Sequence, residues 1–128
     1  ATARNEFSFS LQLGYMRPAV NAVSGLVILA FQDAERRRSI IAQGPAQPDD
    51  TVALEAQMQS IASAGYLQSD SHHILGVTDI CAPITDHAGR GIASIVIPCL
   101  RRIDEETPFD PLRKALVATC AEISGGLL

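Results

Sequence analysis

The chain of 128 residues contains no tryptophan, and only 5% of its residues are aromatic. Since 47% of its residues are apolar, it can build a sizeable core, but that core has to be aliphatic. Basic residues are also few, and the formal net charge is −4. Neutralising nucleic-acid phosphates requires a surplus of Lys and Arg. The composition therefore argues for one domain that does not hold nucleic acid by itself.

Several segments and motifs are also missing. The sequence shows no signal peptide, and its longest apolar run, 26–31, is too short to span a membrane. It has no nucleophile elbow, phosphate-binding loop, dinucleotide fingerprint or zinc-protease motif. We therefore expect a cytoplasmic protein with no cofactor, no catalytic residue and no membrane partner. The arginine clusters at 36–38 and 101–102 are predicted to be solvated surface rather than a phosphate site.

The cysteines do not form a metal-binding or redox motif. Cys81, Cys99 and Cys120 are far apart in the sequence, which predicts reduced, buried thiols. His72 and His73 follow Asp70, but adjacent residues of an extended segment point to opposite faces, so no metal site is predicted. A thiol enzyme that pairs Cys81 with one of the histidines stays open as a minor hypothesis.

Periodicity and capping signals predict the elements outside the centre of the chain. Strict alternation predicts a strand over 7–13, with Phe7, Phe9, Leu11 and Leu13 facing inward. Asp33 is expected to cap a helix over 34–43, and residues 44–48 form a loop. The other expected elements are a helix over 18–32, a helix that begins at residues 49–51 and ends at Gly65, and a strand over 66–68. Asp110-Pro111 is expected to begin a terminal helix. This helix has one apolar stripe of Leu112, Leu116, Cys120, Ile123 and Leu127.

Residues 76–99 read as two strands joined by a polar turn that contains Asp86 and two glycines. Period two places Ile80, Ala82 and Ile84 on one face of the first strand, and it places Asp79 and Cys81 on the other. The second strand is apolar on both faces, which predicts cover on both faces. A hairpin within helices indicates an α+β fold.

Two residues conflict with their surroundings. Asp79 is a carboxylate in an otherwise apolar strand, so it either caps the strand entry or supplies the polar group of a ligand pocket. Gly25 interrupts a helical stretch at a cost of about 1 kcal/mol relative to alanine. Its presence favours either close approach of a ligand or another element, or tight packing of the helix on the sheet.

Taken together, these segments resemble the C-terminal effector-binding domain of IclR-type bacterial transcription regulators. The resemblance covers essentially the whole chain, because its matching segments occur in the family's order. These segments are 13–18 with Ser24-Gly25 and Leu29-Ala30-Phe31; then Ala64-Gly65-Tyr66; and then Gly76-Val77, Ile80, Ala82-Pro83-Ile84, Asp86, Gly89 and 92–97.

The resemblance implies a GAF-like fold, a curved antiparallel sheet flanked by helices. Residues 1–128 are then expected to be a single effector-binding domain. The first strands of the domain and a DNA-binding winged helix-turn-helix are expected to be missing from its N-terminal side. The implied partners are a small-molecule effector, a second copy in a homodimer or homotetramer, and DNA only through the missing domain.

The family's effector pocket maps onto one set of residues in this chain. These are Val23, Ser24, Gly25, Ser69, Asp70, Asp79, Val96 and Pro98. Val96 and Pro98 supply no hydroxyl where the family often places small polar residues that hold a carboxylate. Asp79 would repel a carboxylate unless it were protonated or paired. The residues favour a neutral, hydroxylated or cationic ligand, or none. A pure assembly module with a vestigial pocket is the main alternative.

Overall fold

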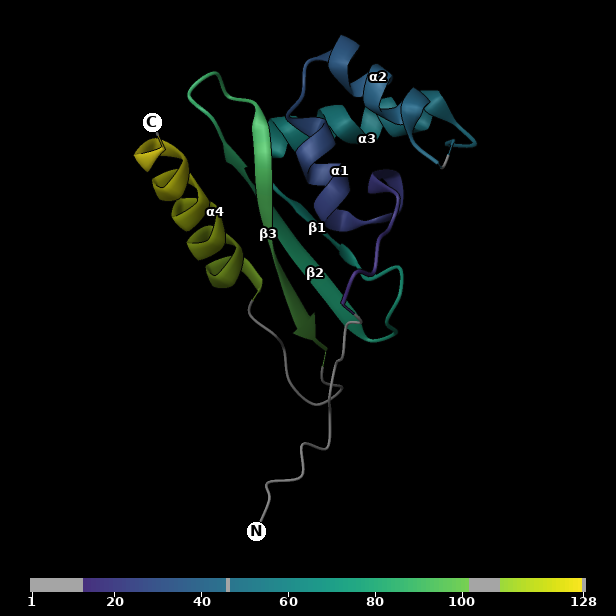
Figure 1. Ribbon diagram of the computed structural model, residues 1–128. Coiled ribbons are helices and arrows are strands. Elements are labelled where there is room, and N and C mark those ends of the chain that lie inside the picture. The colour runs from purple at the N-terminus through teal and green to yellow at the C-terminus, as the bar shows by residue number, and fades with distance from the viewer. Residues whose placement is uncertain (1–12, 46, 102–108, 128) are drawn as a thin grey trace.

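In the part of the chain that the structure describes, three antiparallel strands lie at the centre of the fold in the order β1 (Leu67–Asp70), β2 (Val77–Thr85) and β3 (Gly91–Leu100) (Figure 1). The computed structural model describes residues 13–45, 47–101 and 109–127. The strand expected over 7–13 lies outside the described residues except for Leu13, which lies in a turn and is exposed instead of facing inward. The described elements are η1 (Ala19–Asn21), α1 (Val23–Ala30), α2 (Ala34–Gln43), α3 (Thr51–Ala64), β1 (Leu67–Asp70), β2 (Val77–Thr85), β3 (Gly91–Leu100) and α4 (Phe109–Gly126).

Local capping signals fixed the ends of α2 and α3 as predicted. The Asp33 carboxylate accepts a hydrogen bond from the Arg36 amide at 2.8 Å, and Asp50 accepts one from Ala53 at 2.9 Å. Gly65 ends α3 in the left-handed region with φ of 85°. These side chains satisfy backbone groups that a helix end leaves free. Asp86 similarly accepts two backbone hydrogen bonds within the hairpin turn.

Three predicted boundaries were wrong. The helix expected over 18–32 is divided into η1 and α1, because Ala22 is extended with φ of −132°. The strand expected over 66–68 is β1, which runs from Leu67 to Asp70. The terminal helix α4 begins at Phe109, so Asp110 lies in its first turn instead of capping it. Each boundary depends on contacts between elements as well as on local sequence.

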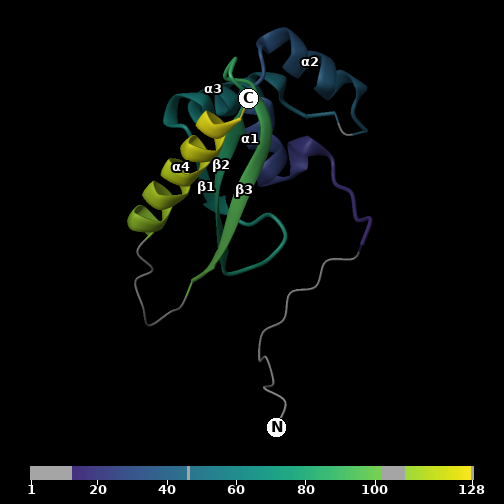
Figure 2. The same ribbon diagram turned by 60° about the vertical axis from the view of Figure 1, so that its left-hand side comes forward.

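Helices cover both faces of the sheet, with α4 on one face and α1 on the other (Figures 1 and 2). Ile80 and Ala82 of β2 pack with Leu116 and Cys120 of α4. Cys81, between them in sequence, packs in the core of α1, to which α3 adds Met58 and Ile61. The predicted alternation of β2 is therefore confirmed. The apolar stripe of α4 is buried in its middle, whereas Ile123 and Leu127 near its end are exposed.

The second hairpin strand is less covered than predicted. Its end residues Ile92 and Leu100 are 53% and 49% exposed. Among the described strands β3 has one partner, β2, and therefore lies at an edge, whereas β2 lies in the centre. The prediction of cover on both faces is therefore wrong near the ends of this strand. Of the two hairpin strands, β2, which contains Asp79, is the more buried.

Arg37 is buried, contrary to the prediction that residues 36–38 are solvated surface. Its guanidinium forms a two-point ion pair with Glu55 of α3 and donates to the Gln32 carbonyl at 3.0 Å. Arg36 and Arg38 are exposed as expected. This difference could not be predicted locally, because the partner carboxylate of Glu55 lies in another helix. The ion pair joins α2 and α3 beside the end of α1.

Of the helices that the structure describes, none is both long enough and apolar enough to cross a membrane.

Candidate ligand-binding site

Three of the eight predicted site residues lie in a row across the sheet. Asp79 of β2 pairs with Ser69 of β1 on one side and with Pro98 of β3 on the other. In antiparallel strands, directly opposed side chains emerge on the same face, about 5 Å apart at Cβ. The next row on this face contains Cys81, which packs in the core cluster of α1. The Asp79 row therefore lies on the α1 side of the sheet.

Asp79 is a half-buried carboxyl group within the strand and does not cap the strand entry. Burial raises the pKa of Asp79, because removing a carboxylate from water disfavours its charged form. His72 and His73, on the loop between β1 and β2, lower the pKa of Asp79 to a smaller extent. The carboxyl group thus keeps a need for hydrogen-bond donors.

The Ser69 hydroxyl is the other unusual polar group of the row. Its Oγ atom is buried, and it has no hydrogen-bond partner in the described structure. Most buried polar side-chain atoms in proteins do have a partner, so this exception marks Ser69 as a candidate binding group. The sequence predicts Ser69 in a polar connection, whereas the structure places it in β1 opposite Asp79.

The amino-terminal end of α1 contributes three predicted residues with different environments. Val23 is buried in the core cluster. The Ser24 carbonyl accepts a hydrogen bond from Ser94 Oγ of β3 at 3.2 Å. A Cβ atom on Gly25 would lie only 2.3 Å from the Ala19 carbonyl oxygen. The close approach that Gly25 permits is therefore made by η1, another element of the chain.

Ser94 was not predicted as a site residue, although it ties α1 to β3. It lies on the same face as Cys81 and Pro98, as the register shows. Period two along β3 from Val96 would have indicated this face. A small polar residue in an otherwise apolar strand was the available signal.

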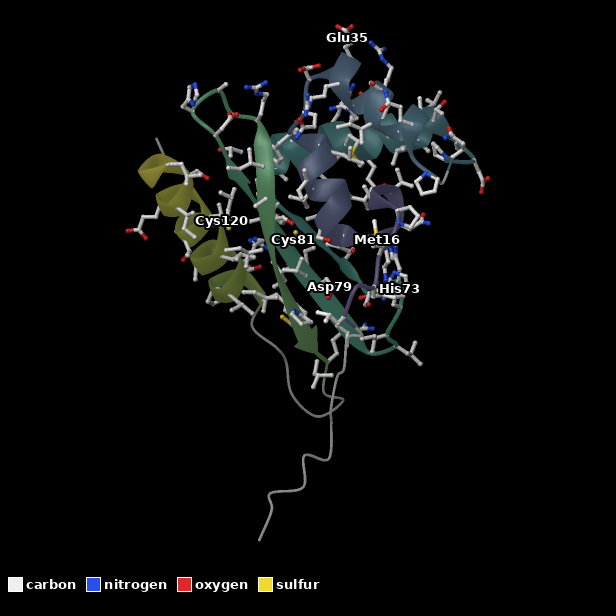
Figure 3. The ribbon with its side chains drawn as sticks, viewed as in Figure 1. Met16, Glu35, His73, Asp79, Cys81 and Cys120 are labelled. Carbon is white, nitrogen blue, oxygen red and sulfur yellow. The ribbon has the colours of Figure 1, made fainter. Side chains whose placement is uncertain are left out.

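The loop between β1 and β2 approaches η1 beside the row. The ring nitrogen Nε2 of His73 lies 3.2 Å from the Asn21 carbonyl oxygen. Figure 3 shows His73 and Asp79 near the amino-terminal end of α1. The row is thus bordered by α1, by η1 and by this loop.

Asp70 does not join the other predicted residues. Strand alternation directs it to the face opposite Ser69, and it pairs with Thr78. The Thr78 hydroxyl donates to its carboxylate at 3.2 Å, and Arg101 lies 3.7 Å from the same oxygen. Val96 lies one row away from Asp79, opposite Cys81. The structure therefore gathers Ser69, Asp79 and Pro98, and separates Asp70 from them.

Four cavities of the structure lie elsewhere. One of about 840 Å³ lies between α2 and α3, and another of about 320 Å³ lies between residues 16–20 and α2. Two more lie beside α4 and at the exposed end of α2. None of these four is lined by any of the eight predicted residues.

The residues that a thiol enzyme would need are not brought together. Cys81 lies within β2, whereas His72 precedes this strand and His87 follows it, at its opposite ends. Burial raises the pKa of the Cys81 thiol to about 11, which suppresses the nucleophilic thiolate. Cys99 and Cys120 are also free and buried, as predicted. Within the described ranges, no cluster of three or more His, Cys, Asp or Glu side chains is placed to hold a metal ion.

Comparison with known families gives one match over nearly the whole chain. Residues 2–125 match the family described as bacterial transcriptional regulator IclR C-terminal. No protein among those of curated function is similar enough in sequence to match.

Solved structures with the same fold are also transcription regulators. The Agrobacterium tumefaciens repressor BlcR is 24% identical, with a TM-score of 0.71 over 97% of this chain and 52% of that one. A mutant PobR inducer-binding domain from Acinetobacter, in complex with 3-hydroxybenzoic acid, is 23% identical, with a TM-score of 0.66 over 84% and 67%. An IclR homolog from Microbacterium hydrocarbonoxydans, in complex with 4-hydroxybenzoate, is 19% identical, with a TM-score of 0.65 over 95% and 51%. The chain thus spans about half the length of BlcR and of the Microbacterium homolog.

Proposed function

The chain belongs to the IclR C-terminal family of bacterial transcriptional regulators, and from this membership we propose that it is the effector-sensing domain of such a regulator. The effector is a small molecule, and the Asp79 row, beside the amino-terminal end of α1, is its site. DNA binding belongs to a further domain on the N-terminal side, and the assembly is a homodimer or homotetramer in the cytoplasm. The proposal includes no catalytic step.

The observation that carries the proposal is the pair of polar groups in the row. A half-buried carboxyl group and a buried, unpaired hydroxyl lie opposite each other on the α1 side of the sheet. Polar groups placed this way in apolar surroundings are typical of small-molecule sites. Two structures with this fold, PobR and the Microbacterium homolog, contain hydroxybenzoates, which supports a small-molecule effector here.

Sensing would operate through α1, because this helix is linked to β3 at both ends. Ser94 Oγ donates to the Ser24 carbonyl, and Gln32 Nε2 donates to the Gly91 carbonyl at 2.7 Å. A ligand beside the amino-terminal end of α1 binds one arrangement of these contacts better than another. Its binding shifts the population of domain conformations toward the preferred arrangement. The separate DNA-binding domain would respond to that shift.

A thermal-shift screen of small metabolites tests the proposal. A true effector stabilises the wild-type chain and stabilises Asp79→Leu much less, because leucine fills the space and removes the acceptor. Asp49→Asn is the matched control, since Asp49 is exposed on the loop before α3. If no compound stabilises the wild type, or if the stabilisation is the same in Asp79→Leu, sensing at this site is wrong.

The alternative, an assembly module with a vestigial pocket, is favoured by one observation. The four described cavities avoid the Asp79 row. Light scattering combined with the screen separates the two functions. A stable oligomer that no metabolite stabilises supports assembly alone, and a monomer contradicts it.

A further inference from the structure

The residues opposite Asp79 on the two neighbouring strands supply few hydrogen-bond donors. An ionised carboxylate only accepts hydrogen bonds. Its directly opposed neighbour on β3 is Pro98, which has no N–H group and no polar side-chain atom. On β1 the opposed residue is Ser69, whose hydroxyl has no partner in the described structure. The row thus offers an acceptor and a single hydroxyl.

The next row adds little to this inventory. Val96 is apolar, and the Cys81 thiol is a weak donor in the core. The Ser94 hydroxyl is already used, because it donates to the Ser24 carbonyl at 3.2 Å. A carboxylate placed directly against Asp79 would therefore meet a like charge. A group that donates hydrogen bonds would meet an acceptor that lacks them.

On this basis we propose that the Asp79 row binds the hydrogen-bond-donating group of its ligand, an ammonium or a hydroxyl, and disfavours a carboxylate there. This inference rests on the proposed effector site and specifies its chemistry. The donor group binds the Asp79 carboxylate and accepts, when it is a hydroxyl, from Ser69. Burial reinforces the selection, since hydrogen bonds to a charged partner strengthen when water is excluded.

The two histidines are the groups that could reverse this selectivity. His72 and His73 are exposed on the loop beside the row, and protonated imidazoles would attract an anion. His73 is already in contact with the Asn21 carbonyl. The Asp79→Asn variant separates their effect from that of Asp79.

Three ligands with one scaffold test the proposal: benzylamine, benzyl alcohol and benzoate. Each is titrated into the ¹⁵N-labelled chain while the amide signals of Ser69, Asp79 and Ser24 are followed. Benzylamine is expected to bind about 10-fold more tightly than benzoate, with benzyl alcohol between them, because one charge-assisted hydrogen bond replaces a repulsion. The amine and the alcohol together show whether charge or hydrogen bonding dominates.

The variants identify the residue responsible. Asp79→Asn is expected to reduce the preference for the amine over benzoate to about 1-fold, because it removes the charge and keeps the shape. Asp49→Asn leaves the preference unchanged. Equal or tighter binding of benzoate to the wild type at the same amides overturns the donor-group inference and leaves the effector site standing. A metabolite that stabilises the chain through Asp79, with no response to any of the three probes, also overturns it. If neither probes nor metabolites act at this face, the proposed site itself fails.

Discussion

Ser69 and Asp79 lie directly opposite each other on β1 and β2, one as a buried hydroxyl without a partner and the other as a half-buried carboxyl group. The Ser69 hydroxyl lacks the hydrogen bond that usually compensates for burial. Such a pair is costly for folding alone and useful for binding. The unsatisfied hydroxyl of Ser69 opposite Asp79 thus connects a cost in the free domain to the ligand binding proposed for it.

The first prediction concerns the free energy of unfolding of Ser69→Ala. Because the hydroxyl is buried without a partner, its removal is expected to leave stability unchanged or raise it by up to about 1 kcal/mol. Ser94→Ala is the matched change, since Ser94 Oγ donates to Ser24, and it should lower stability by about 1 kcal/mol. Urea denaturation measures both. A loss in Ser69→Ala as large as in Ser94→Ala would show that this hydroxyl has a partner in solution.

The second prediction concerns the ion pair between α2 and α3. Arg37→Met keeps the bulk of the side chain but leaves Glu55 and the Gln32 carbonyl without their donor. We expect a loss of about 2 kcal/mol, below the value for a fully buried pair because Glu55 is partly exposed. Arg36→Met, on the exposed side of α2, should change stability by less than about 0.5 kcal/mol. Equal effects of the two variants would contradict the pairing.

The third prediction is the pH dependence of the same pair. The hydrogen bond from Arg37 lowers the pKa of Glu55 below its ordinary value of 4.5. A lowered folded-state pKa stabilises the protein above pH 4.5, and this contribution is lost as the pH falls through the folded-state pKa. The stability difference between wild type and Arg37→Met should therefore be constant near pH 7 and narrow in acid. Denaturation curves across this range give the difference, and a gap that widens in acid would refute the assignment.

The fourth prediction uses two helical glycines. A Cβ atom on Gly25 would lie 2.3 Å from the Ala19 carbonyl oxygen and 2.5 Å from its Cα, whereas one on Gly125 would meet nothing within 4 Å. Gly25→Ala is expected to lose about 1–3 kcal/mol through overpacking. Gly125→Ala, near the end of α4, should gain up to about 1 kcal/mol from helix propensity. Thermal denaturation compares them, and a neutral Gly25→Ala would mean that η1 does not pack on α1 in solution.

Local signals predicted some elements and tertiary contacts decided others. Asp33, Asp50 and Gly65 act within a few residues, so the ends of α2 and α3 could be read from the sequence. The break at Ala22 could not, since it accompanies the packing of η1 against Gly25. The exposure of Ile92 and Leu100 in β3 could not be predicted either, because an apolar strand has the same sequence pattern whether or not its ends are covered.

The candidate site was predictable in parts only. Asp79 stood out because a carboxylate is rare in an apolar strand, and period two gave its face. The register that places Ser69 and not Asp70 opposite Asp79 depends on strand pairing, which one strand's sequence does not contain. The ion-pair partner of Arg37 was equally hidden, because Glu55 lies in another helix and the pairing depends on how α2 and α3 pack.

The most direct test of the account locates bound ligand on the molecule. The chain offers two distinct places, the Asp79 row and the cavity of about 840 Å³ between α2 and α3. Amide signals of the ¹⁵N-labelled chain are recorded with and without a metabolite that stabilises it. We predict that Ser24, Ser69 and Asp79 shift with the same affinity that the thermal stabilisation gives. Shifts confined to the α2–α3 cavity, around Thr51 and Glu55, would contradict the assignment of the effector site.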